Sequence, residues 1–159
     1  MVKWAMVIDV SRCTACYDCV LACKDEYWEN DYPPYSAGQP RLGHFWINLI
    51  KKERGQYPHI KVAYMPILCK HCDNAPCMKA AKNNAIYKRP DGIVIIDPEK
   101  AKGQKHLASL EACPYGVIFW NEEKSIPQKC TLCAHLLDQG WKEPRCVEAC
   151  PTGALLFGD

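Results

Sequence analysis

The chain has 159 residues, which fits one domain or two small ones that share a core, and twelve of these residues are cysteine. Its 20 lysines and arginines and 18 aspartates and glutamates give a net charge of +2. This positive excess is too small to form a basic surface that binds the phosphates of a nucleic acid. No stretch approaches the roughly 18 uninterrupted apolar residues of a membrane helix, so we expect no nucleic-acid partner and no membrane span.

The amino-terminal segment MVKWAMVIDV lacks the long apolar stretch and the small-residue cleavage site of a secretory signal. We therefore expect a cytoplasmic chain, with export alongside a partner left open. Because cytosolic thiols are kept reduced, dense cysteine in such a chain predicts a metal framework rather than disulfide bonds. Within this segment, residues 6–10 predict an opening strand.

The first cysteine group has the spacing of bacterial ferredoxin loops, Cys13-x-x-Cys16-x-x-Cys19-x-x-x-Cys23. Residues 24–62 follow with no cysteine and are rich in tyrosine, tryptophan, proline and charge. A connection of this length is unusual in a small domain and suggests an insertion that docks a partner. The alternative is that its rings cap the local core. The candidate interface residues are Trp28, Tyr32, Tyr35, Phe45 and Trp46.

The second group, Cys69-x-x-Cys72-x-x-x-x-Cys77, offers three thiolates, and Ala81 stands where a fourth cysteine would follow. Residues 85–97 contain the Pro-Asp-Gly turn sequence between two apolar runs and predict a hairpin.

The stretch from residue 98 to 112 precedes a single cysteine, Cys113, whose following proline is typical of the last cysteine in a ferredoxin run. Asp97 as an N-cap and Pro98 at the first position predict a helix over residues 98–112. We expect Leu107 and Leu110 to face the space that a cluster loop would fill. Three expected cysteines are absent in either register: counting back from Cys113 gives Gly103, His106 and Ser109, and counting forward from DPEK gives Ala101, Gln104 and Leu107.

The last group is complete again, with Cys130-x-x-Cys133, a gap of twelve residues, and Cys146-x-x-x-Cys150 followed by proline. Residues 116–121 and 154–158 predict the strands that follow each Cys-Pro pair.

In two-cluster ferredoxins the fourth cysteine of each run binds the cluster of the partner run. Only the pairing of run one with run four, and of run two with run three, places all twelve cysteines in complete sets. These are tetrad one (Cys13, Cys16, Cys19, Cys150), tetrad two (Cys130, Cys133, Cys146, Cys23) and tetrad three (Cys69, Cys72, Cys77, Cys113). A rival scheme, in which runs one and four each bind a cluster with their own four cysteines, stays open.

The absent ligands all belong to one site, so the pattern predicts a four-cluster plan that has lost one cluster and keeps three [4Fe-4S] clusters. Zinc bound by paired C-x-x-C motifs is the alternative, and iron and sulfide analysis separates the two.

Several other side chains adjoin the cysteines. His71 and His135 are candidates to donate hydrogen bonds to cluster sulfur, and Lys70, Lys129 and Arg145 to offset cluster charge. The alternative is that these side chains are simply packed or solvated. We predict no catalytic residue, because the chain has no recognisable triad, phosphate loop or acid/base pair, and every cysteine serves as a ligand. Such clusters transfer single electrons.

The predicted fold is α+β, a duplicated bacterial-type ferredoxin with a cysteine-free aromatic insertion. Residues 1–23 with 114–159 form a module with two clusters, residues 63–113 form a module with one cluster and one vacated site, and residues 24–62 are the insertion.

From about residue 5 to its end, the chain resembles the iron-sulfur subunits of the dimethyl sulfoxide reductase superfamily of molybdenum and tungsten enzymes. The phrases DGIVIIDPEKAKG, CPYGV, WNEE and QKCTLCAHLLD are most similar to a subgroup that includes pyrogallol-phloroglucinol transhydroxylase and catechol dehydroxylases. The resemblance implies that all twelve cysteines are cluster ligands. It also implies a large catalytic partner subunit that holds molybdenum or tungsten in bis-molybdopterin guanine dinucleotide.

We therefore expect a non-catalytic electron-transfer subunit with three [4Fe-4S] clusters, docked on an enzyme of phenolic substrates. Dehydroxylation, hydroxylation and transhydroxylation all remain open. The alternatives are a free-standing polyferredoxin that serves several redox partners, and a protein whose clusters are mainly structural.

Overall fold

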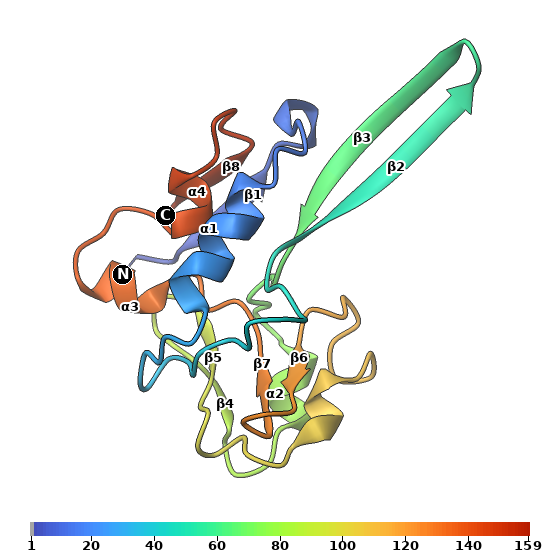
Figure 1. Cartoon of the computed structure of the whole chain (residues 1–159). Coiled ribbons are helices and arrows are strands. Elements are labelled where there is room, and N and C mark those ends of the chain that lie inside the picture. The colour runs from blue at the N-terminus through green and yellow to red at the C-terminus, as the bar shows by residue number, and fades with distance from the viewer. Residues whose placement is uncertain (1) are drawn as a thin grey trace.

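The computed structural model describes residues 2–159. It is an α+β protein whose named strands pair into two-stranded antiparallel sheets (Figure 1). The helices are α1 (Asp18–Tyr27), α2 (Pro76–Ala80), α3 (Ala134–Asp138) and α4 (Arg145–Glu148), with short 3-10 helices η1 (Val10–Arg12) and η2 (Lys105–Ala108). Among residues 2–159, no helix has the length and apolar composition that crossing a membrane requires.

The two ends of the chain meet in one sheet, where β1 (Ala5–Ile8) pairs with β8 (Leu155–Gly158). The backbone N–H of Lys3 also donates to the Asp159 carboxylate at 2.7 Å. The strands predicted at residues 6–10 and 154–158 are confirmed with shifted bounds. The first strand ends at Ile8 because the Asp9 side chain accepts from the N–H of Ser11 and starts η1.

The predicted hairpin at residues 85–97 is confirmed as β4 (Ile86–Lys88) and β5 (Val94–Ile96). This hairpin is the wall between two cores, since successive side chains of a strand point to opposite faces. Ile93 and Ile95 lie in the first core, whereas Val94 and Ile96 lie in the second. Each core therefore uses one face of the same short sheet.

The two cores differ in composition. The first core contains Tyr27, Trp46 and five buried cysteines from runs one and four. The second core contains Leu107, Ala101 and other small or aliphatic side chains around Cys77 and Cys113.

A long ribbon projects from the body and is formed by β2 (Asn48–Gln56) and β3 (His59–Ile67) (Figure 1). It crosses the expected boundary between the insertion and the next module at residues 62 and 63. Most of its residues are exposed, and only its base packs against the body. The ribbon therefore has almost no support from the rest of this chain.

The aromatic residues before the ribbon divide into two groups. Trp46 is 1% exposed and lies 4.4 Å from Tyr27 between ring centroids, and Tyr32 stacks on His135 at 3.8 Å. For Trp46 the interface hypothesis is wrong, because the core of the protein already covers its ring. Trp28 and Phe45 remain 39% and 38% exposed, so their interface role stays a prediction.

The helix expected over residues 98–112 is wrong, because this stretch forms turns and the single 3-10 helix η2. Its first turn does form, with the N–H of Ala101 donating to the Asp97 carbonyl. The Gln104 side chain then donates to the Lys100 carbonyl at 2.9 Å, which is the acceptor that the Gln104 backbone would use in an α-helix. Gly103, with φ of +78°, breaks the helical path at the same point.

The two possible sets of positions for the absent cysteines differ in burial. Ala101, Gln104 and Leu107 of the forward register are buried, at 0%, 8% and 0% exposure. Gly103 and His106 of the backward register are exposed. Leu110 is 70% exposed, so the expectation that it faces inward is wrong, whereas Leu107 does face inward.

The strand predicted over residues 116–121 begins only at Phe119, as β6 (Phe119–Asn121), which pairs with β7 (Ile126–Gln128). The preceding residues are used in a turn, where the N–H of Gly116 donates to the Cys113 carbonyl.

Candidate metal centres

Tetrad one lines a cavity at the base of the ribbon. Its four cysteines surround this cavity together with Leu49 of β2 and Pro66 of β3. Burial raises the pKa of the Cys19 thiol to about 11, and the neighbouring charges of Cys16, Cys150 and Cys13 raise it further. Cys16 is exposed, whereas each of the other eleven cysteines is buried or partly buried.

Cys150 differs from the other members of tetrad one. Burial acts to raise the pKa of its thiol, but hydrogen bonds from the backbone of Leu155 and the Thr152 side chain hold that pKa below its ordinary value. The turn after Pro151 therefore directs donors at the sulfur, which stabilises a thiolate there.

Tetrad two is buried inside the first core, and α1 carries one of its members to the other three. Burial raises the pKa of the Cys23 thiol well above its usual range, followed by the charges of Cys130, Cys146 and Cys133. Burial likewise raises the pKa of Cys130 to about 12. These four thiols therefore lie together although Cys23 is far from the other three in the sequence.

Tetrad three lines a second cavity, formed by Cys69, Cys72, Cys77 and Cys113 with Lys129 at its wall. Burial raises the pKa of the Cys77 thiol, while the charge of Lys129 opposes that rise. All twelve cysteines are free thiols.

The tetrads also adjoin one another. The charge of Cys19 acts on the pKa of Cys23 and of Cys146, and the charge of Cys69 acts on the pKa of Cys130. Tetrad two thus has neighbouring thiols in both of the others.

The cysteine loops hold the backbone in an uncommon conformation. Ala15, Tyr17, His71, Leu132 and Cys133 have φ between 47° and 67°, in the left-handed region that L-residues seldom adopt. Such residues concentrate at functional sites, where the surrounding structure supports the strain. Here the strain turns backbone N–H groups toward sulfur: His71 donates to Cys69 at 3.5 Å, and Leu132 donates to Cys130 at 3.4 Å.

The donor sets fit iron-sulfur clusters. Four thiols gather at each tetrad, and burial raises the pKa of Cys19, Cys23 and Cys77, one thiol in each set, so a cationic centre favours ionisation of the whole set. Four thiolates are the ligand set of a [4Fe-4S] cluster. Among residues 2–159, no group of three cysteine, histidine or acidic side chains is arranged to hold a single metal ion.

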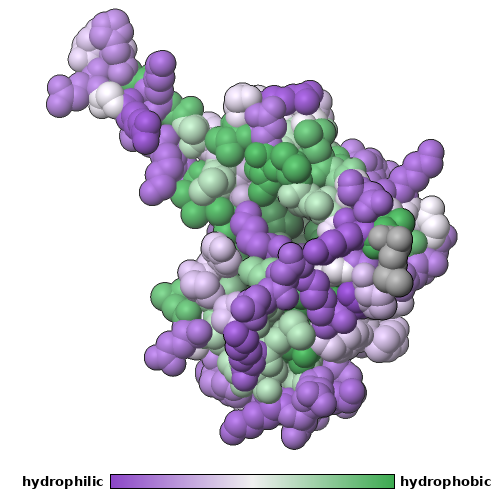
Figure 2. All heavy atoms as spheres, turned by 180° about the vertical axis from the view of Figure 1, so that it is seen from behind, coloured by the Kyte–Doolittle hydropathy of each residue, from purple (hydrophilic) through white to green (hydrophobic). Residues whose placement is uncertain are grey.

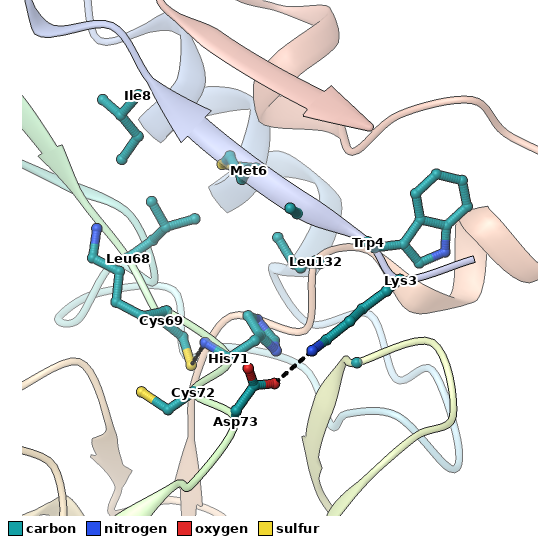
Figure 3. Close-up of a pocket in the computed structure, with 13 residues that line it drawn as sticks. Lys3, Trp4, Met6, Ile8, Leu68, Cys69, His71, Cys72, Asp73 and Leu132 are labelled. Carbon is teal, nitrogen blue, oxygen red and sulfur yellow. Dashed lines mark hydrogen bonds and ion pairs between the residues drawn. The ribbon is translucent and has the colours of Figure 1, made fainter. Parts of the chain in front are cut away.

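A further cavity of about 260 Å³ lies beside tetrad three, between β1 and the second cysteine run (Figure 3). Cys69, His71 and Cys72 line one side, Trp4 and Met6 line another, and Lys3 pairs with Asp73 at 3.0 Å. This cavity brings solvent close to two cysteines of tetrad three.

The predicted polar neighbours have different environments. His135 is buried and its Nε2 lies 2.8 Å from the Glu26 carboxylate. Arg145 forms ion pairs with Glu26 and Glu148, and Lys70 is exposed. Lys129 is 2% exposed, so the interpretation of this residue as an ordinary solvated lysine is wrong.

Two further residues of the site, Glu26 and Tyr27 on α1, are not marked by the cysteine pattern. The Tyr27 hydroxyl forms a hydrogen bond with Thr131 at 2.7 Å and also lies against Cys133, where it opposes the rise of that thiol's pKa by burial. Glu26 accepts from the Tyr32 hydroxyl at 2.9 Å in addition to its contacts with His135 and Arg145. Both residues lie three or four positions after Cys23, the spacing that shares a helix face, so helical periodicity is the signal that would have found them.

Comparison with known proteins agrees with this site. Residues 60–159 match the family model of the 4Fe-4S dicluster domain. The pyrogallol hydroxytransferase small subunit of Pelobacter acidigallici is 52% identical over 153 residues, covering 94% of this chain and 54% of the relative. This chain therefore spans about half the length of that relative.

Two further relatives are covered more completely. A putative dimethyl sulfoxide reductase iron-sulfur subunit from Halobacterium salinarum is 34% identical, over 100% of this chain and 67% of the relative. A sulfite dehydrogenase subunit from Allochromatium vinosum is 36% identical, over 100% of this chain and 70% of the relative. The chain belongs to the 4Fe-4S dicluster family, among the iron-sulfur subunits of the dimethyl sulfoxide reductase superfamily.

Proposed function

We propose that this chain is the electron-transfer subunit of a molybdenum or tungsten enzyme and carries three [4Fe-4S] clusters, one at each tetrad. The observation that carries the proposal is that the twelve cysteines gather in three groups of four. Cys150 lies with Cys19, and Cys23 lies with Cys130, Cys133 and Cys146, which favours crossed ligation over the rival in which each run serves its own cluster.

The order of the clusters follows from the contacts between tetrads. Tetrad two adjoins tetrad one through Cys19 and tetrad three through Cys69 and Cys130, so we propose that its cluster is the middle carrier. When bound, the clusters supply one-electron carriers. The chain contributes the thiolates, the burial that excludes water from tetrad two, and the backbone N–H groups near sulfur.

The chemistry of the substrate is proposed to lie in a large partner subunit that holds bis-molybdopterin guanine dinucleotide. A phenolic substrate is supported by the relative named pyrogallol hydroxytransferase small subunit, at 52% identity. Dehydroxylation, hydroxylation and transhydroxylation are the reactions that this proposal covers, and no residue of this chain is assigned a catalytic role.

The ribbon supports a docking role for this part of the chain. In its register Lys51 faces Tyr64, Glu53 faces Val62 and Gly55 faces Ile60, so these residues share one face. Lys51 and Glu53 form an ion pair at 2.5 Å, so their two charges balance on that face. The other side chains of the face are mainly apolar. Ile60 and Val62 are 54% and 43% exposed, although an isolated two-stranded ribbon is only marginally stable in water.

The same face of the ribbon leads back to tetrad one, because Leu49 and Pro66 at its base line that cavity. Beside the base, apolar side chains gather on the surface of the body (Figure 2). Val7 and Leu156 lie opposite each other in the β1–β8 sheet and are 60% and 46% exposed. A catalytic subunit seated along the ribbon would therefore lie next to Cys16, the exposed cysteine of tetrad one.

The test is anaerobic affinity purification of the tagged chain, with mass spectrometry of co-purifying proteins and analysis of iron, sulfide, molybdenum and tungsten. We expect a large molybdopterin protein in stoichiometric amount and iron sufficient for three clusters. Recovery of the chain alone at full cluster occupancy would favour the free-standing polyferredoxin. Zinc in place of iron and sulfide would contradict the proposal altogether.

A further inference from the structure

Lys129 is a buried positive charge without a negative partner. It follows directly after β7 and is only 2% exposed. Its ammonium donates to the carbonyl oxygen of Val94 at 2.5 Å and to that of Cys130 at 3.0 Å. Within residues 2–159, no carboxylate lies within ion-pair distance of Lys129, whereas Lys88, which is only partly buried, pairs with Asp73 at 2.6 Å.

The ammonium lies between two of the tetrads. Lys129 lines the cavity of tetrad three, and its charge acts on Cys77 of that tetrad. The same charge acts on Cys130 of tetrad two, which is itself a neighbour of Cys69 of tetrad three. One positive group thus faces both sites.

The surroundings of Lys129 give it no other compensation. His71 also faces it, but the Nδ1 atom of His71 accepts a hydrogen bond from the N–H of Val94 at 2.9 Å, so this ring is held in a neutral form. Carbonyl oxygens satisfy two of the ammonium protons without cancelling its charge. A buried charge is costly unless an opposite charge lies close by.

We propose that Lys129 is the shared counter-ion of the clusters at tetrads two and three and that it favours reduction of both. A cubane held by four thiolates carries net negative charge, and reduction adds one more negative charge beside the ammonium. The inference rests on the proposed function in that it requires the clusters to be present. It adds that one residue links the reduction potentials of two adjacent carriers.

The experiment is an anaerobic redox titration of the purified holoprotein, followed by electron paramagnetic resonance, with wild type and Lys129→Met compared. The methionine keeps much of the volume of the lysine stem and removes the charge. We expect the equilibrium constant for reduction to fall about tenfold or more at two of the three clusters, a shift of about 59 mV for one electron. The cluster at tetrad one, identified by the spectral change in Cys16→Ser, should keep its potential.

Lys70→Met is the matched control, because Lys70 adjoins Cys69 but is exposed, and its charge is screened by water. Unchanged potentials in Lys129→Met, or an equal shift at all three clusters, would overturn the proposal. If Lys129→Met loses iron, Lys129→Gln, which can still donate to the two carbonyls, is titrated in its place. Loss of iron confined to tetrads two and three in both variants would support a counter-ion role, and equal loss from all three sites would contradict it.

This outcome is separate from that of the proposed function. Iron and sulfide analysis of the wild-type protein tests whether clusters are bound at all. A protein that binds three clusters but shows no effect of Lys129→Met refutes only the role of Lys129.

Discussion

The two cores share the β4–β5 hairpin as a wall, yet they use the neighbouring space in different ways. On one side, all four cysteines of tetrad two and Cys19 of tetrad one are buried in the first core together with Tyr27 and Trp46. On the other side, a single tetrad adjoins a compact set of small and aliphatic side chains, with Ala101 and Leu107 fully buried. We predict that a cluster site has been lost here, and in the structure Ala101 and Leu107 stand buried at two of the positions where its cysteines would lie.

The filling of the second core depends on one polar residue as well. The Oε1 atom of Gln104 accepts from the N–H of Lys82 at 2.9 Å, and its Nε2 atom donates to the carbonyl oxygens of Lys82 and Lys100. This side chain satisfies backbone groups that a cluster loop would otherwise arrange differently. The two cores therefore differ in that the second is filled both by apolar side chains and by the hydrogen bonds of one buried amide.

The largest expected effect concerns the crossed ligation of the first core. Cys23→Ser and Cys133→Ser should alter the same paramagnetic signal, because both thiolates are proposed to hold the middle cluster, and each should lower iron content by about a third. Cys19→Ser should alter a different signal. If Cys23→Ser instead matches Cys19→Ser, runs one and four bind their own clusters and the crossed scheme fails.

The second prediction tests the apolar filling of the second core. Leu107→Ala should lower the free energy of unfolding by about 2–5 kcal/mol, since it leaves a cavity where no cluster can enter. Anaerobic urea unfolding followed by circular dichroism measures this change. Leu110→Ala is the control, at 70% exposure, and should change stability by less than about 0.5 kcal/mol. Equal effects of the two variants would refute the inward role of Leu107.

The third prediction tests whether the ribbon beside the first core is a docking surface. The double variant Ile60→Ser with Val62→Ser removes apolar area from one face and should weaken association with the co-purified subunit about tenfold or more. The matched double variant Lys52→Ser with Gln56→Ser changes the opposite face and should have a smaller effect. Binding is measured by interferometry on the holoprotein, and equal losses in both variants would argue against a specific apolar face.

The smallest expected effect concerns the segment before the ribbon. Burial lowers the pKa of His44 to about 4, with a contribution from the charge of Lys24, and the ring stacks on Phe119. As the pH falls below about 6.5, His44 is protonated in the unfolded chain but stays neutral in the folded protein. The contribution of the neutral ring to the free energy of unfolding is therefore full above that pH and is lost as the pH falls toward 4.

His44→Phe removes this titration and keeps an aromatic ring against Phe119. Comparison of thermal unfolding midpoints between pH 7 and pH 5 should show a weaker pH dependence in the variant. The difference should be about 1 kcal/mol at most, because the site is half-buried and partly screened by solvent. A pH dependence identical to that of wild type would contradict a neutral, buried His44.

The hairpin at residues 85–97 and the α+β class could be predicted from the sequence, because they depend on local turn residues and on the alternation of apolar and polar side chains. Prediction from the sequence failed over residues 98–112, where helix propensity predicted an α-helix. There the hydrogen bonds of the Gln104 side chain with Lys82 and Lys100, together with Gly103, outweighed helix propensity. The sequence left open whether Trp46 lies in a core or at an interface, because the sequence pattern of an aromatic residue is the same in both, and the structure buries this ring.

For the site, spacing alone predicted the twelve cysteines as ligands and their grouping into three sets, because a loop that wraps a cluster needs cysteines at fixed short intervals. The sequence left open the register of the missing ligands and whether Lys129 is solvated or buried. Only the tertiary structure decided these points, by burying Ala101, Gln104 and Leu107 and by enclosing Lys129 between two tetrads. The physical reason is that ligand spacing is a property of the local chain, whereas burial and charge compensation depend on segments distant in sequence.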